Sequence, residues 1–144
     1  IIRTTVMVGF PGETQEDFEK LCNFVESAKF DKLGAFAYSK EEGTPAAKLK
    51  EQVHPMTKKA RYNKIMEIQQ KVSEENLNKY IGKELEVLVE GKTIDGKYYV
   101  CRSYMDVPDI DGLIYLNNSK ELKIGDFVKC TIKSSINEYD LLGE

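Results

Sequence analysis

The chain has 144 residues, of which 41% are hydrophobic and 31% charged, and its formal net charge is −3. This composition is typical of one ordinary globular domain or two small ones, and no apolar run approaches the about 18 residues needed to cross a bilayer. The three cysteines lie far apart and are odd in number, which favours a reducing cytoplasm over a secreted disulfide framework.

The first structured segment is predicted to be a strand, a helix and a second strand. Residues 3–8, RTTVMV, form a β-branched run that Gly9 ends, which indicates a buried strand. Thr14 is a suitable helix N-cap with Asp17 in the capping-box position. The apolar positions that follow at helical spacing are Phe18, Leu21, Cys22, Val25 and Ala28. A further apolar strand over 33–38 would complete a βαβ unit with parallel strands.

One βαβ unit cannot close a core, so we expect it to be the end of an α/β barrel or open sheet. After a loop, the sequence predicts a long polar helix from Thr57 to about Lys79, whose narrow apolar stripe suits a surface connector. We therefore divide the chain into an α/β part (1–54), a connector helix (55–79) and a second domain (80–144).

The pattern changes to a period of two after Gly82. In KELEVLVEG, residues Leu85, Val87 and Val89 alternate with Glu84, Glu86, Leu88 and Glu90, which predicts a strand with an inner and an outer face. Four more short strands follow in KYYVCRSY, GLIYL, DFVKCTIKSS and EYDLLGE. Five short strands in about 65 residues favour a small closed barrel of the OB type, so the fold class is α/β followed by all-β.

The turn from Gly9 to Gly12 is the first candidate site. Glycine lets backbone approach a ligand closely, and ligands of α/β folds bind at the carboxyl ends of the strands, where Gly9 and Tyr38 both lie. The alternative is a rigid turn without a ligand. No lysine follows the second glycine, so this is not a phosphate loop.

Other polar residues carry weaker signals. Glu41 and Glu42 could form an acid–base pair, although solvated surface carboxylates are commoner, and His54 before Pro55 reads as a surface residue. The cysteines read as core fillers. With one histidine and no Cys-x-x-Cys pair, the sequence contains no metal-ligand spacing.

The segment CRSYMDVPDIDG is unusually rich in aspartate. Such a cluster repels phosphate and would suit a basic protein partner, whereas the alternative is an ordinary aspartate-capped loop in which Arg102 pairs locally. The candidate partner-binding residues are Arg102, Tyr104, Asp106, Asp109 and Asp111.

Several segments, taken in order, resemble the C-terminal part of the radical-SAM methylthiotransferases. They are VGFPGETQEDF, FDKLGAFAYSKEEGTPAA, RSYMDVPDIDG and the terminal EYDLLGE. The likeness covers nearly the whole chain and points to the RimO-type enzymes, which methylthiolate an aspartate of a small-subunit ribosomal protein. A sister branch modifies an adenosine in tRNA.

The resemblance implies the last strands of a partial, TIM-like radical-SAM barrel, followed by a TRAM domain, an OB-like barrel that recognises the substrate. It also implies S-adenosylmethionine and two four-iron, four-sulfur clusters in the full-length enzyme. The cysteine motif that holds the radical cluster and the cysteines of the second cluster are absent from this sequence. We therefore expect the chain alone to be inactive and to hold neither cluster, with no catalytic and no metal-binding residue of its own.

By the same resemblance, the strand ends at Val8, Gly9, Phe36 and Tyr38 would line the S-adenosylmethionine pocket. Apolar side chains and strand-end backbone would pack against the adenine. The glycine turn would then close one wall of a pocket whose other walls lie outside this sequence.

Three features bear on the substrate. Residues 40–44, KEEGT, stand where the tRNA-modifying branch usually has Arg-Pro-Gly-Thr. Residues 80–144 carry 12 Asp and Glu against 8 Lys and Arg, whereas a domain that binds tRNA should be basic. The segment 106–111 resembles an acidic signature of the ribosomal-protein branch, with Val107 where alanine is usual. These features favour a basic small-subunit ribosomal protein as partner.

Two alternatives stay open: a tRNA adenosine methylthiotransferase, and a non-catalytic adaptor made of a βαβ unit and an OB barrel. Against the adaptor, the parallel strands would leave exposed edges, and the chain begins with Ile rather than Met, which suggests a fragment of a longer protein. Those edges would also allow the fragment to self-associate.

Overall fold

The structure is a computed structural model that describes all residues from 1 to 144. It divides into two compact units, Ile1–Ser73 and Glu74–Glu144, each with a hydrophobic core of its own. The division falls inside helix α2 (Pro55–Asn78). None of the helices combines the length and the apolar character that a membrane span requires.

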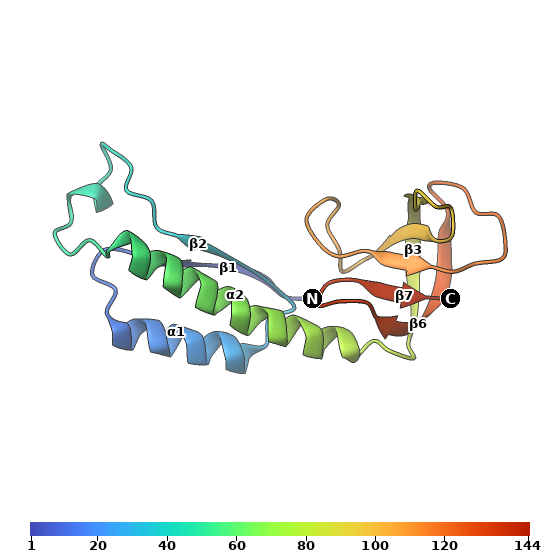
Figure 1. The fold of residues 1–144 in the computed structure, drawn as a ribbon, viewed down its shortest axis with the longest axis horizontal. Helices are drawn as coiled ribbons and strands as arrows, with labels where there is room; N and C mark the ends of the chain where they lie inside the picture. Colours follow the sequence, from blue (N-terminus) through green and yellow to red (C-terminus); the bar gives the residue numbers. More distant parts are fainter. The chain divides into compact units, whose positions relative to one another are not determined.

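The first unit begins with the predicted βαβ arrangement, which is confirmed (Figure 1). Strands β1 (Arg3–Val8) and β2 (Lys32–Ala37) pair in parallel, and helix α1 (Gln15–Ala28) connects them. The capping box is also confirmed. Asp17 N donates to Thr14 Oγ1 at 3.1 Å, and Thr14 N donates to the Asp17 carboxylate at 3.0 Å.

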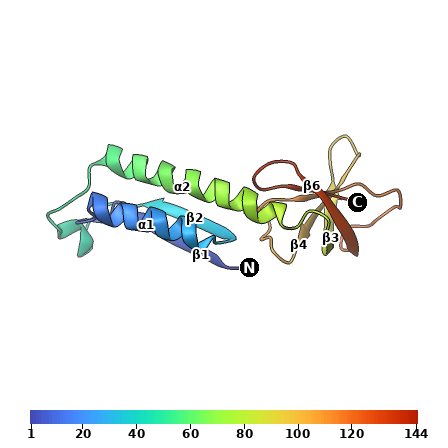
Figure 2. The same ribbon diagram turned by 90° about the horizontal axis from the view of Figure 1, so that it is seen from below.

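Both helices pack on the strands to form the first core, as the two views of the ribbon show (Figure 2). Val8, Val25 and Ile65 are fully buried in it, one from β1, one from α1 and one from α2. The apolar stripe of α2 therefore packs into the first core. The helix contributes to this unit as well as connecting it to the second one. Ala28, expected on the buried face of α1, is exposed, because α1 ends there and Lys29 leaves the helix in a left-handed conformation.

The other face of the two strands is open. Met7 and Phe36 are partners across the sheet, and they are 52% and 62% exposed. The loop after β2 contains a short 3₁₀ helix, η1 (Ala46–Lys48), before α2 begins.

The second unit is a closed five-stranded barrel, as predicted from the sequence. Its strands follow the order β3-β4-β5-β7-β6, with β6 closing onto β3 and β5 running parallel to β7. The strands are β3 (Glu84–Lys92), β4 (Tyr99–Ser103), β5 (Ile114–Leu116), β6 (Phe127–Ser135) and β7 (Leu141–Gly143). This order is that of the OB fold, in which the fourth and fifth strands close the barrel on the first and third.

Alternation along the strands fills the barrel. Leu85, Val87 and Val89 point inward and are buried, as expected, and Cys101 and Cys130 join them. Leu77, from the last turn of α2, is buried in the same core.

These buried thiols predict how the stability of the barrel changes with pH. Burial raises the pKa of Cys101 to about 12 and that of Cys130 to about 11, whereas the pKa of an unfolded thiol is about 8.5. Above that value the unfolded chain loses protons that the barrel keeps, so the free energy of unfolding falls as pH rises. Between pH 8 and 10 we expect a loss of about 1–2 kcal/mol per thiol.

Urea unfolding of the chain and of a Cys101→Ala/Cys130→Ala variant at pH 8, 9 and 10 measures this effect. Lysine and tyrosine titrations are common to both proteins, so only the difference between the two slopes reports the thiols. Parallel slopes would contradict the prediction.

Candidate functional site

The glycine turn after β1 has a defined backbone conformation. Gly9 and Gly12 have φ angles of 73° and 90°, a region that favours glycine. Gly12 N donates to Glu51 O at 2.8 Å, and Tyr38 N donates to Val8 O at 2.8 Å. The turn is thus tied both to β2 and to the loop before α2.

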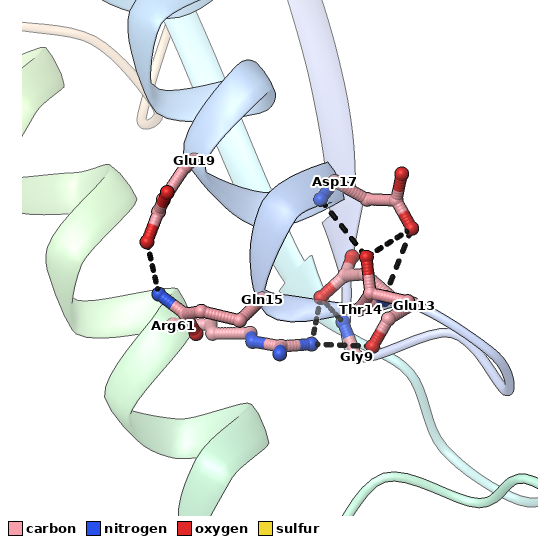
Figure 3. A network of polar contacts seen from close by, with 7 residues as sticks. All are labelled: Gly9, Glu13, Thr14, Gln15, Asp17, Glu19 and Arg61. Carbon is pink, nitrogen blue, oxygen red and sulfur yellow. Dashed lines mark hydrogen bonds and ion pairs between the residues drawn. The ribbon is translucent and has the colours of Figure 1, made fainter.

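A buried ion pair anchors the same turn to α2 (Figure 3). Gly9 N donates to Glu13 Oε1 at 2.9 Å, and the guanidinium of Arg61 pairs with that carboxylate and donates to Glu13 O at 3.1 Å. The side chains of Arg61 and Glu13 are only 8% and 12% exposed, and the guanidinium lies over the ring of Phe18. One carboxylate therefore fixes both the turn and a helix about 50 residues further along the chain.

Tyr38 packs on the other side of the turn. Its ring meets Phe10 edge to face at 5.2 Å, and Lys58 Nζ lies over the ring and donates to Tyr38 O at 2.9 Å. The Tyr38 hydroxyl is buried with no hydrogen-bond partner. A Cβ at Gly9 would overlap Lys58 Cγ, so glycine is required there for space as well as conformation.

The four residues predicted to bind a cofactor lie at neighbouring strand ends, but only two of them line a pocket. Val8 is fully buried in the first core, and Gly9 is covered by Lys58. Phe36 and Tyr38 line a pocket of about 470 Å³ together with residues of α2, among them Lys58 and Tyr62. Sequence reasoning missed Glu13 and Arg61. Glu13 could have been recognised as an acid just before a helix, but Arg61 has no local signal in its polar helix.

The aspartate segment between β4 and β5 is largely braced from within. The Asp106 carboxylate accepts from Ser103 N and Oγ, and Asp111 accepts from Val107 N at 2.7 Å. A Cβ at Gly112 would overlap the carbonyl group of Tyr139, so the glycine permits a close backbone approach. These contacts give two of the three aspartates a structural role.

Of the remaining predicted residues of this region, one forms an ion pair and two are exposed to solvent. Arg102 Nε donates to Glu90 Oε1 at 2.6 Å, which is the local pairing considered as an alternative. Asp109 and Tyr104 are exposed, Tyr104 by 73%.

Two hollows lie on the outside of the barrel, and the smaller is lined by two of the predicted partner-binding residues, Arg102 and Tyr104. One, of about 970 Å³, lies between the hairpin 92–98, strands β4 and β5, and the loop 136–140, and is lined by Tyr98 and Tyr115 among others. OB barrels commonly bind ligands on this face. The other, of about 190 Å³, is lined by Glu86, Leu88, Arg102, Ser103, Tyr104 and Phe127.

No group of three or more histidine, cysteine, aspartate or glutamate side chains is placed to hold a metal ion. Cys22 lies on α1 in the first unit, whereas Cys101 and Cys130 lie inside the barrel. These three thiols therefore do not fit the ligand set of an iron–sulfur cluster.

The barrel sequence matches a known domain family. Residues 81–144 match the family model described as "TRAM domain". The second unit is thus a TRAM domain with the closed barrel described above.

Comparison over the whole chain finds similar proteins that share one name. The chain is 58% identical over 145 aligned residues to "Ribosomal protein uS12 methylthiotransferase RimO" of Alkaliphilus oremlandii. It is 52% and 47% identical to the proteins of the same name from Petrotoga mobilis and Thermotoga maritima. Each alignment covers 99–100% of this chain and 32–33% of the relative. The chain is thus similar along its whole length to proteins named RimO methylthiotransferase, and it spans about a third of the length of these relatives.

The buried pair predicts a large effect on stability. In Arg61→Met the Glu13 carboxylate stays buried without its partner, and we expect the first unit to lose about 3–5 kcal/mol. Glu13→Gln should cost a similar amount, and the double variant should lose clearly less than the sum of the two, because the two residues form one interaction. Urea unfolding followed by circular dichroism measures all three.

The matched control is Lys20→Gln, which removes an ion pair with Glu16 in which the two side chains are 68% and 76% exposed. Its cost should stay below about 0.5 kcal/mol. An equally small change in Arg61→Met would show that the buried pair does not hold the unit together.

Proposed function

We propose that the chain is the part of a methylthiotransferase that binds substrate through its TRAM domain and supplies one wall of the S-adenosylmethionine pocket. The reaction adds a methylthio group to the β carbon of an aspartate in a small-subunit ribosomal protein. The observation that carries the proposal is the 46–58% identity, along the whole chain, to proteins named for the methylthiolation of uS12. The reducing cytoplasm, where ribosomes are found, agrees with three free cysteines.

The first unit fits the role of a pocket wall. Met7 and Phe36 form an apolar surface on the open face of the two strands, which is suited to pack against the adenine. The Arg61–Glu13 pair holds the turn at the end of β1 rigid, so the wall is already in place before a ligand binds. Val8 and Gly9 would contribute as the backbone support of the wall, because the Val8 side chain faces the core.

S-adenosylmethionine supplies both a deoxyadenosyl radical and a methyl group when it is bound to enzymes of this chemistry. This chain's residues would orient the adenine and keep water away from it. The cysteines do not fit an iron–sulfur cluster, so no step that needs a cluster is assigned to them. We assign the two four-iron, four-sulfur clusters to other parts of the full-length enzyme.

The barrel fits a basic protein better than a nucleic acid. Its 12 acidic and 8 basic side chains create a field that attracts a positively charged ribosomal protein and repels phosphate. The alternative substrate, an adenosine of tRNA, draws support from Tyr98 and Tyr115, which line the large groove and could stack on bases. The charge of the domain argues against it.

The proposal predicts that the 144-residue chain binds purified uS12 and leaves tRNA unbound at 0.15 M salt. The affinity for uS12 should fall as salt rises, because salt screens the attraction between exposed charges. Fluorescence anisotropy with labelled uS12 and labelled tRNA tests both statements. Tight binding of tRNA together with no binding of uS12 would reverse the assignment of the partner.

Among the aspartates between β4 and β5, Asp109 is the suitable one to neutralise, because Asp106 and Asp111 also hold the loop. Asp109→Asn should slow association with uS12 by about two- to threefold and leave the fold unchanged. Asp106→Asn serves as a comparison that alters the loop as well as the charge. An unchanged association rate in Asp109→Asn would remove this residue from the interface.

The chain alone should not cleave S-adenosylmethionine. Incubation with S-adenosylmethionine, iron, sulfide and dithionite should produce no 5′-deoxyadenosine by liquid chromatography, because the chain has no cysteine set for a cluster. The full-length enzyme prepared in the same way is the positive control. Production of 5′-deoxyadenosine by the 144-residue chain would overturn the prediction.

A further inference from the structure

We propose that the small cleft on the outside of β3, β4 and β6 receives a single lysine or arginine side chain of the protein partner. The inference rests on the proposed function, in which the barrel binds a basic ribosomal protein, and it adds where and how one contact is made. The cleft measures about 190 Å³ and is lined by Glu86, Leu88, Arg102, Ser103, Tyr104 and Phe127.

The backbone register brings the lining residues together. Leu88 pairs with Phe127 of β6 on one side and with Arg102 of β4 on the other. Leu88 therefore forms an apolar floor in the middle of three strands. Tyr104 follows the end of β4 and completes the wall beside Arg102.

Two aromatic rings at the cleft are unused within the chain. Phe127 and Tyr104 are 68% and 73% exposed, and neither ring takes part in a ring pair or lies under a cation. Other tyrosines of this unit behave differently: Tyr80 and Tyr99 each lie under a lysine. Exposed aromatic faces of this kind attract cations and also pack against aliphatic stems.

The charge of the cleft favours a cation. Three glutamates project from the outer face of β3, and two are neutralised: Glu84 by Lys129 at 2.9 Å and Glu90 by Arg102 at 2.6 Å. Glu86 lines the cleft and has no ion pair of its own, although Lys129, which pairs with Glu84, lies opposite it across β3 and β6 and attracts it more weakly. Because these two ion pairs cancel the charges of Glu84 and Glu90, the net charge around the cleft is −1 and is located at Glu86.

A lysine or arginine satisfies all of these features at once. Its aliphatic stem would lie on Leu88 between the two rings, and its charged end would meet Glu86 and the ring faces. A nucleotide could stack on the same rings, but its phosphate would then lie near an unpaired carboxylate. The protein partner is therefore favoured over RNA.

The test compares variants of the 144-residue chain in binding to purified uS12. Glu86→Gln removes the charge and keeps the shape, and Phe127→Ser removes a ring that is mostly exposed. We expect each to raise Kd about three- to tenfold. The matched control is Glu121→Gln, which makes the same change in net charge outside the cleft and should leave Kd within about twofold of the parent value.

A second measurement tests directly whether a cation binds in the cleft. Titration of the ¹⁵N-labelled chain with Nα-acetyl-arginine amide should shift the backbone amide signals of Leu88, Ser103 and Phe127. Nα-acetyl-norleucine amide, which has no charge, should shift them much less. The spectra also show whether each variant is folded.

The outcomes separate this inference from the proposed function. If uS12 binds but Glu86→Gln and Phe127→Ser behave like Glu121→Gln, the cleft is not used and only this inference fails. If uS12 does not bind but the arginine probe shifts the cleft signals, the proposed partner fails and the cation site stands. Absence of both effects overturns both. Binding of an RNA oligonucleotide that Phe127→Ser weakens and Glu86→Gln strengthens would assign the cleft to nucleic acid instead.

Discussion

The strict alternation of side chains along β3 is the constraint on which the barrel depends. Leu85, Val87 and Val89 enter the core because the period of a strand is two, and the residues between them must then face outward. A shift of one residue in register would bury glutamates and expose valines, so the core fixes the register strongly. The same register fixes the positions of the residues on the outer face. Glu86 and Leu88 are held in place by the pairing of β3 with its neighbouring strands and by the packing of Leu85, Val87 and Val89.

The first unit is organised by a polar interaction instead. Two strands and two helices provide a small core, and a single buried carboxylate coordinates three segments through Gly9, Glu13 and Arg61. An ion pair removed from water is stabilising only when its geometry and hydrogen bonds are good, and it makes the loss of either member costly. Such a pair therefore specifies one conformation of the turn more than it adds stability. This is the property that a wall of a ligand pocket requires.

The sequence predicted elements well wherever one local rule decides the structure. Both parallel strands, the capping box at Thr14 and all five barrel strands follow from periodicity and caps, and the structure has them. The sequence also predicted the helix α2 close to its observed bounds. It did not predict how α2 packs in the first core, because the stripe around Ile65 is narrow and its partners lie far away in the sequence. The sequence did not indicate sites that are formed by residues far apart along the chain. Nothing near Arg61 indicates Glu13, and nothing near Glu86 indicates Phe127.

The acidic character of the barrel has two origins that composition cannot separate. Asp95, Asp106, Asp111, Asp126 and Asp140 accept hydrogen bonds that hold turns, and they would be needed even if the barrel bound nothing. Glu84, Glu90 and Glu144 are in ion pairs with lysine or arginine. Glu86 and Asp109 belong to neither group. In the proposed function, all of these charges contribute to a field that attracts a basic protein, but only carboxylates without hydrogen bonds or ion pairs inside the chain can exchange water for a partner's cation without breaking a bond. Under that proposal, net charge selects the class of partner, while the internal hydrogen bonds determine which few residues can touch it.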